Sequence, residues 1–199
     1  MSRYELGQDP YTYENSNILI NIPNIRNQEE LDLFEKDAVA QQVDNLDFIG
    51  PPYDLDTLCD IHYVLFCNVY MWAGELRTTG IKKGNTRFWQ PERIRMESEK
   101  VFSEIANIVI QDDVDKHTLC NQLAIVYCEL NMIHPFREGN GRAQRILFEF
   151  IIACVGYQID WSLVSSEKWL SANIAGVICN YQPMEEIFLM IISKFEMDF

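Results

Sequence analysis

A short polar break between two apolar helices constrains this chain more than any other feature of its sequence. Residues 116–133 and residues 140–155 each repeat apolar side chains at helical spacing and predict buried helices. Between them, Pro135 disfavours helical backbone at His134, so we expect the first helix to end there. Asn140 is a favoured N-cap for the second helix. The predicted centre of the fold is therefore a helix pair joined by a tight loop.

This loop combines residue types that bind anions. Gly139 and Gly141 permit backbone conformations and close approaches that other residues block. A glycine-rich loop that enters a helix N-terminus presents free N–H groups to an anion. Arg142 and Arg145 are three residues apart, so they share one face of the first turn, and their guanidinium groups suit phosphate oxygens. The loop therefore predicts a phosphate site.

Two further side chains give the predicted site its chemistry. A phosphate would repel Glu138 unless a divalent cation joined them, and Mg²⁺ commonly binds one or two carboxylates together with substrate phosphates. His134 lies at the other lip of the loop, and histidine is the commonest general base near neutral pH. Each feature alone is typical of a structural loop, but within twelve residues they indicate phosphoryl or nucleotidyl transfer.

The rest of the chain predicts further helices and one hairpin. Apolar spacing predicts helices over residues 28–44, 54–72, 92–110, 165–178 and 183–197. Residues 1–27 carry turn signals and predict an irregular arm. Residues 75–91 are β-prone on both sides of a turn and predict a β-hairpin or extended flap. The predicted fold class is a single, mostly α-helical domain with one small hairpin.

Composition restricts the partners and the compartment. The 199 residues carry a formal net charge of −14, which argues against nucleic acid as a partner, yet residues 77–100 hold 7 of the 16 Lys and Arg. This basic island is a candidate contact for an anionic partner. No apolar stretch is long enough for a membrane span, and the N-terminus lacks a secretory signal. The six cysteines form no metal-like pair, and a cytoplasmic location fits them best.

The loop also resembles a known family signature. From His134 to Arg145 it matches the Fic pattern H-P-F-x-[D/E]-G-N-G-R-x-x-R at every defined position. The segment WAGELR at residues 72–77 is similar to the segment that precedes the Fic flap, and Asp9-Pro10-Tyr11 and the helix near Glu35 are similar to the N-terminal part of stand-alone Fic proteins. The resemblance implies a helical Fic domain over residues 28–199 after an arm at residues 1–27, with a flap at about residues 76–90 and an active-site loop at residues 134–142.

The resemblance implies a protein adenylyltransferase that moves AMP from ATP to a Ser, Thr or Tyr hydroxyl of a target protein. His134 would be the catalytic base, and Glu138 would hold Mg²⁺ on the α- and β-phosphates. The implied nucleotide-binding residues are Phe136, which anchors the loop, Gly139, Asn140 and Gly141, which cradle the phosphates, Arg142 on the β-phosphate side, and Arg145 on the γ-phosphate. The implied target-aligning flap comprises Ile81, Lys82, Lys83, Gly84, Asn85, Thr86, Arg87 and Phe88, with Phe88 as its clamp.

Other activities on this fold stay open. The Doc branch, which is kinase-like, resembles this motif but carries lysine where this chain has Gly141, so glycine favours AMP transfer. Phosphocholine transfer is a second alternative. A non-catalytic interaction module is a third, against which the intact His134, Glu138, Asn140 and Arg142 argue. His62 and His117 are expected to be bystanders, one in the core and one in solvent.

The resemblance also implies how the enzyme is regulated and what it modifies. Many Fic proteins are restrained by a helix bearing S/T-x-x-x-E-G/N, and this chain contains no match to that pattern. We therefore expect a separate small antitoxin to supply the helix and to place its glutamate near Arg145, as in toxin–antitoxin pairs. Related toxins modify bacterial type II topoisomerase subunits. Host small GTPases are the alternative target if the protein is a secreted effector.

Overall fold

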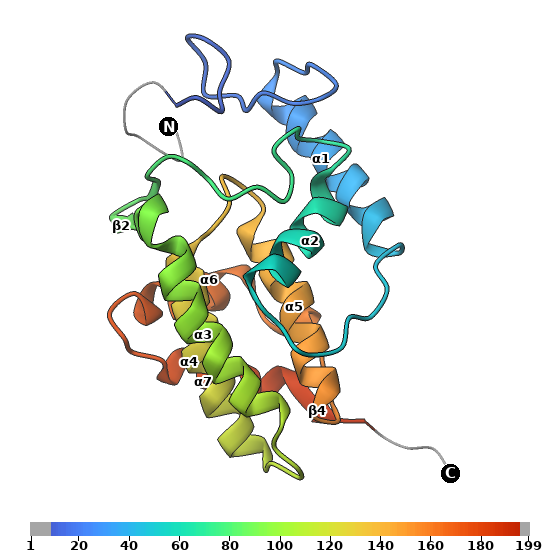
Figure 1. The fold of residues 1–199 in the computed structure, drawn as a ribbon, viewed down its shortest axis with the longest axis vertical. Coiled ribbons are helices and arrows are strands. Elements are labelled where there is room, and N and C mark those ends of the chain that lie inside the picture. The colour runs from blue at the N-terminus through green and yellow to red at the C-terminus, as the bar shows by residue number, and fades with distance from the viewer. Residues whose placement is uncertain (1–8, 196–199) are drawn as a thin grey trace.

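The computed structural model describes residues 9–195, so the first eight residues of the expected N-terminal arm lie outside it. Within these residues the fold is built from α-helices, and the strands are short (Figure 1). The helices are α1 (Gln28–Val43), α2 (Leu55–Phe66), α3 (Ile94–Val109), α4 (Lys116–Ile133), α5 (Asn140–Cys154), α6 (Ser166–Gly176) and α7 (Gln182–Ile191). Single turns of 3₁₀ helix cover Pro91–Arg93 and Trp161–Leu163. The predicted fold class is confirmed.

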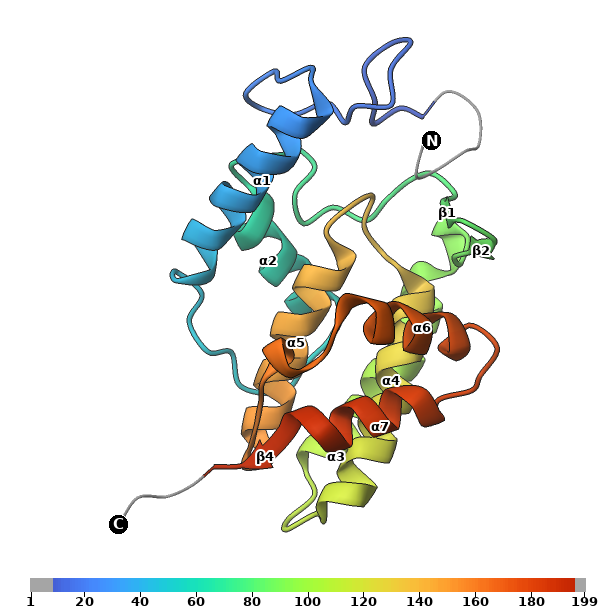
Figure 2. The same cartoon turned by 180° about the vertical axis from the view of Figure 1, so that it is seen from behind.

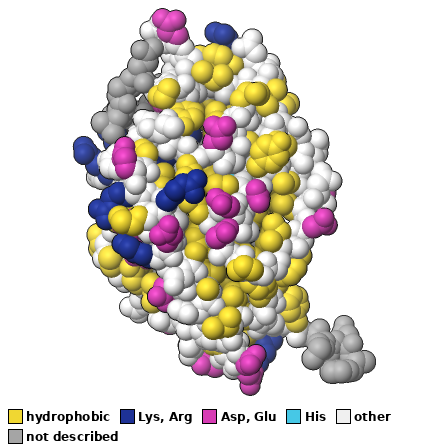
Figure 3. Space-filling model, viewed as in Figure 1, with side chains coloured by type: hydrophobic (Ala, Val, Ile, Leu, Met, Phe, Trp, Pro, Cys, Tyr) yellow, Lys and Arg dark blue, Asp and Glu magenta, His cyan; other side chains and the backbone are white. Residues whose placement is uncertain are grey.

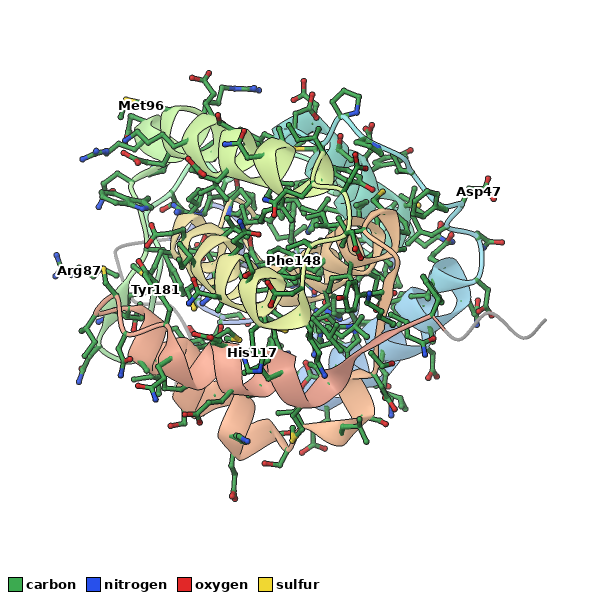
Figure 4. All side chains as sticks on the ribbon, turned by 90° about the horizontal axis from the view of Figure 1, so that it is seen from below. Asp47, Arg87, Met96, His117, Phe148 and Tyr181 are labelled. Atoms are coloured by element: carbon green, nitrogen blue, oxygen red, sulfur yellow. The ribbon has the colours of Figure 1, made fainter. Side chains whose placement is uncertain are left out.

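Helices α4 and α5 form the centre, as the sequence predicts. Helix α4 packs against α3, α6 and α7, while α5 packs against α2, and α1 covers α2 (Figures 1 and 2). The rings of Tyr127, Phe148 and Phe188 meet where α4, α5 and α7 converge, with centroids 4.7 Å apart for Tyr127 and Phe148. Figure 4 shows Phe148 in the middle of the molecule, and Asp47, Arg87 and Met96 at its rim. This rigid centre holds both ends of the 134–139 loop.

Two predicted helices are shorter than their sequence pattern indicates. Helix α2 ends at Phe66 instead of continuing to residue 72, and the backbone N–H groups of Val69 and Tyr70 bond to the Phe66 carbonyl in the turn that follows. Tyr70 and Trp72 then stack at 4.3 Å between centroids. Helix α7 ends at Ile191, where the chain becomes extended.

Residues 9–195 contain two antiparallel strand pairs where the sequence predicted one hairpin. The predicted hairpin is confirmed but small: β1 (Lys82–Lys83) pairs with β2 (Thr86–Arg87). The missed pair joins β3 (Tyr157–Ile159) to β4 (Ile192–Lys194). Strand β4 lies inside the residues predicted as the last helix. The apolar run through residues 187–192 fits a helix and a buried strand equally well, so spacing could not separate them. No helix of the described chain is both long and apolar enough to cross a membrane.

Candidate active site

His134 lies at the C-terminal end of α4 in a left-handed conformation. Its φ is 48°, which ends the helix at Ile133 as Pro135 predicts. The ring Nδ1 lies 3.1 Å from the carbonyl oxygen of Asn131. Because a carbonyl oxygen can only accept, Nδ1 carries the proton and Nε2 has a free lone pair. The imidazole is therefore held in the tautomer that can accept a proton at Nε2.

The environment keeps this imidazole neutral. Burial is the largest of the effects that lower the pKa of His134 to about 3; the Asn131 carbonyl opposes it, and the positive charges of Arg77 and Lys83 add to it. The ring of Phe88 stacks on it with centroids 3.9 Å apart and planes 17° apart. The residue is still partly open to the surface and lines a cavity. His134 is thus an uncharged, partly accessible proton acceptor.

Arg77 connects the hairpin to the end of α4. Its Nε donates to the His134 carbonyl at 2.7 Å, and its terminal nitrogens donate to the carbonyls of Thr79 at 2.7 Å and of Ile133 at 3.2 Å. It also donates to the Trp89 carbonyl. The side chain is 2% exposed, so these bonds are shielded from water. The sequence predicted strand structure for residues 76–81, but Arg77 holds this segment against the loop instead.

The loop after His134 is fixed by Asn140 and Gly139. The Asn140 side chain accepts from the backbone N–H of Phe136 at 2.8 Å and donates to the Phe136 carbonyl at 2.8 Å. Asn140 is the first residue of α5, and Gly139, with φ 81°, is its N-cap. The prediction that Asn140 is the N-cap is therefore wrong. Its amide satisfies both main-chain groups of Phe136 and so closes the loop.

Phe136 and His62 form the floor beneath the loop. Phe136 is fully buried, stacks on His62 with centroids 3.9 Å apart and does not line the cavity described below. His62 accepts from the Gly74 N–H at Nδ1, and Nε2 therefore donates to the Glu138 carbonyl at 3.0 Å. Burial lowers the pKa of His62 to about 4. His62 is a core residue, as predicted, but it also ties residues 72–77 to the loop.

A cavity of about 490 Å³ opens above this floor. It is lined by His134, Glu138 and the first turn of α5, including Gly141, Arg142 and Arg145. Tyr127, Val177 and four residues of α6 also line it: Trp169, Leu170, Asn173 and Ile174. The structure thus brings together the predicted base, carboxylate, glycines and arginines. It also adds α6, which carries no motif that sequence reasoning could have recognised.

The hairpin forms one wall of the cavity through Lys83, Gly84, Thr86 and Phe88. Ile81 and Phe88 point inward and are buried, whereas Lys83, Asn85 and Arg87 are exposed. Figure 3 shows Lys and Arg side chains gathered on the side of the molecule where β2 lies in Figure 1. Phe88 was predicted to clamp a target, but in this structure its ring covers His134.

Comparison with known proteins decides the family of this chain. A protein-family model described as the Fic/DOC family matches residues 52–152. This chain belongs to the Fic/DOC family. A protein named probable protein adenylyltransferase Fic from Escherichia coli (strain K12) is 33% identical over 189 residues, 94% of this chain and 94% of that relative.

Solved structures of Fic domains share the fold over nearly the whole chain. The N-terminal Fic domain of a VirB-translocated Bep effector protein from Bartonella quintana, solved with bound ADP, has a TM-score of 0.82. It is 28% identical and covers 92% of this chain and 94% of its own. A second relative, probable protein adenylyltransferase y4lH from Sinorhizobium fredii (strain NBRC 101917 / NGR234), is 33% identical over 92% of this chain and 96% of its own.

One ion pair of this Fic chain was not predicted from the sequence. Arg142 Nη2 lies 2.6 Å from Oε1 of Glu35 on α1 and 3.9 Å from Oε1 of Glu138. The guanidinium carbon also lies 4.6 Å from the centre of the Phe66 ring. A second ion pair joins Arg137 of the loop to Asp9 at 2.6 Å, which ties the start of the described chain to the active-site loop.

Proposed function

We propose that this chain is a protein adenylyltransferase that transfers AMP from ATP to a hydroxyl side chain of another protein. The observation that carries the proposal is the unprotonated Nε2 of His134, a residue that lines the same cavity as Glu138, Arg142 and Arg145. Both curated relatives are named as probable protein adenylyltransferases, and the Bartonella quintana domain binds ADP.

The nucleotide would lie along the cavity from the loop to α6. The N-terminus of α5 and the two arginines suit the triphosphate. The apolar and aromatic side chains of Trp169, Leu170, Ile174 and Val177 suit the adenine ring at the other end. Gly141 leaves open space at the α5 N-terminus, since a Cβ there would meet no atom within 4 Å. The phosphates can therefore approach the backbone closely.

In this mechanism the target hydroxyl gives its proton to Nε2 of His134 as its oxygen attacks the α-phosphorus. The bond from the α-phosphorus to the bridging oxygen breaks, and pyrophosphate leaves. Arg142 and Arg145 would stabilise the negative charge that develops on the leaving group. Negative phosphates near His134 also favour its protonated form, which offsets the lowering of its pKa by burial.

The residues present fit a magnesium ion. Glu138 lines the cavity and offers carboxylate oxygens, the hard ligands that Mg²⁺ prefers. Its Oε1 accepts from the adjacent Gly139 N–H at 3.1 Å and lies 3.9 Å from Arg142, and the other oxygen can serve as a ligand. The described residues contain no cluster of three or more metal-binding side chains, which agrees with a site completed by substrate phosphates. Bound there, the ion would neutralise phosphate charge.

The exposed hairpin edge would align the target segment by strand pairing. Candidate targets are a bacterial type II topoisomerase subunit and, for a secreted effector, a host small GTPase. A small antitoxin is the proposed regulator, because the chain lacks the inhibitory sequence pattern. A second cavity, of about 210 Å³, supports this: Arg145 borders it together with Val39, Val43 and Ile146, so an added helix would reach the arginine from there.

Labelling distinguishes AMP transfer from phosphorylation. Purified chain is incubated with Mg²⁺, bacterial lysate and ATP labelled at either the α- or the γ-phosphate, in parallel with His134→Ala. We expect α-label on a target protein and its loss in the variant. Label from the γ-phosphate alone would assign the chain to the kinase branch and overturn the proposal. Expression with and without the protein encoded next to it tests the antitoxin, since a lone chain that is fully restrained would refute regulation in trans.

A further inference from the structure

Arg142 is held from outside the nucleotide cavity by a residue of the N-terminal helix. Glu35 Oε1 accepts from Arg142 Nη2 at 2.6 Å, and Glu35 Oε2 accepts from the hydroxyl of Tyr70. The face of the guanidinium lies over the Phe66 ring. Glu35 on α1, Phe66 on α2 and Tyr70 just after α2 therefore hold one arginine of α5, which lies far from all three in the sequence.

The geometry indicates that Glu35 supports Arg142 and does not compete with a nucleotide for it. Glu35 is not among the residues that line the cavity, whereas Arg142 is. Among residues 9–195 the Arg142 guanidinium forms ion pairs only with Glu35 and, weakly, with Glu138 at 3.9 Å, which leaves most of its N–H donors for a ligand. A carboxylate that blocked the site would have to stand in the cavity and occupy those donors. Glu35 does neither.

The contact is also built to be rigid. The Glu35 side chain is 13% exposed, and both of its oxygens are engaged. Tyr70 is 2% exposed and stacks on Trp72, so the hydroxyl that fixes Glu35 cannot move freely. An unrestrained arginine would lose rotamer freedom when it bound a phosphate. An arginine already fixed by Glu35 has lost most of that freedom on folding.

We propose that Glu35 is a positioning residue that orients Arg142 toward the β-phosphate of the bound nucleotide, with Tyr70 fixing Glu35 in turn. This inference rests on the proposed function, because it needs a nucleotide phosphate beside Arg142. It assigns a role in nucleotide recognition to the N-terminal helix, which lies outside the signature loop.

The test compares nucleotides with and without a β-phosphate. Binding of AMP and of the ATP analogue AMP-PNP, each with Mg²⁺, is measured by calorimetry on the full chain. We expect Glu35→Gln to weaken AMP-PNP binding about tenfold and to change AMP binding less than about twofold, since AMP has no β-phosphate for Arg142. Tyr70→Phe should weaken AMP-PNP binding about threefold. Glu29→Gln, the same exchange at an exposed position of α1, is the matched control and should change neither.

A double-mutant cycle separates positioning from loss of structure. In an Arg142→Lys background, Glu35→Gln should have little further effect on AMP-PNP binding. Equal weakening of AMP and AMP-PNP would show a general structural effect and overturn the inference. Unchanged or tighter AMP-PNP binding by Glu35→Gln would identify Glu35 as a spectator or a competitor. Failure of the wild-type chain to bind either nucleotide would overturn the proposed function, and the role of Glu35 with it.

Discussion

Two glycines two residues apart in the loop should respond oppositely to the same substitution. Gly139 has φ 81°, and a Cβ there would stand 2.5 Å from Cε2 and Cζ of the buried Phe66 ring. A left-handed alanine costs about 1–2 kcal/mol, and an overpacked methyl group costs about 1–3 kcal/mol. Gly139→Ala should therefore lower the free energy of unfolding by about 2–5 kcal/mol.

Gly141 is the matched control because neither a left-handed backbone nor a steric clash opposes a methyl group at this position. A Cβ there meets no atom within 4 Å, and the residue lies in the first turn of α5. Gly141→Ala should leave stability unchanged or raise it by up to about 1 kcal/mol, since alanine favours a helix. The new methyl group would occupy space at the cavity, so AMP-PNP binding should weaken by about tenfold or more.

Urea denaturation and calorimetric binding, measured on both variants, provide the comparison. We expect Gly139→Ala to unfold at a lower urea concentration than the wild type. Gly141→Ala should stay fully folded but lose nucleotide affinity. A Gly139→Ala protein as stable as the wild type would refute the steric argument. Wild-type affinity for AMP-PNP in Gly141→Ala would show that the phosphates do not approach the backbone at this point.

Three further predictions concern the groups that hold the loop and the base. Arg77→Met leaves buried carbonyls at His134 and Thr79 without their donor, and it should lower the free energy of unfolding by about 3 kcal/mol in urea titrations. Asn140→Asp keeps the acceptor for the Phe136 N–H but sets a carboxylate against the Phe136 carbonyl; it should destabilise the fold by about 1–3 kcal/mol, where an unchanged midpoint would contradict the role of the amide. Because burial lowers the pKa of His134 from 6.5 to about 3, only the unfolded chain takes up this proton as the pH falls from 7 to 5. The free energy of unfolding should therefore fall by about 2 kcal/mol because of this group between pH 7 and pH 5. In denaturation curves at the two pH values, His134→Asn should show a fall that is smaller by this amount.

The sequence predicted those parts of the site that depend on local backbone chemistry. Pro135 fixed the end of α4, and Gly139 supplied the left-handed residue before α5. The error at Asn140 shows the limit of this reasoning, because asparagine is a good N-cap only when its amide has no better partner. Here the Phe136 main chain offers both a donor and an acceptor within 2.8 Å, which a propensity cannot reveal.

The residues that the sequence did not reveal act across long separations. Glu35 and His62 reach the loop from α1 and α2, and neither belongs to a pattern that names its partner. The α6 wall of the cavity consists of ordinary apolar positions such as Leu170 and Ile174, whose exposure is set by helix packing alone. The β3–β4 pair was missed for a related reason, since its strands pair across more than thirty residues.

Arg77 shows how such distant contacts serve the proposed chemistry. Its guanidinium binds the carbonyls of Thr79 and Trp89, which flank the hairpin, and those of Ile133 and His134, which flank the base. The backbone bond from the Trp89 N–H to the Met132 carbonyl, at 3.2 Å, adds a second connection. In the proposed mechanism, a target strand paired to the hairpin would therefore be placed relative to Nε2 of His134 by the hydrogen bonds of this buried arginine.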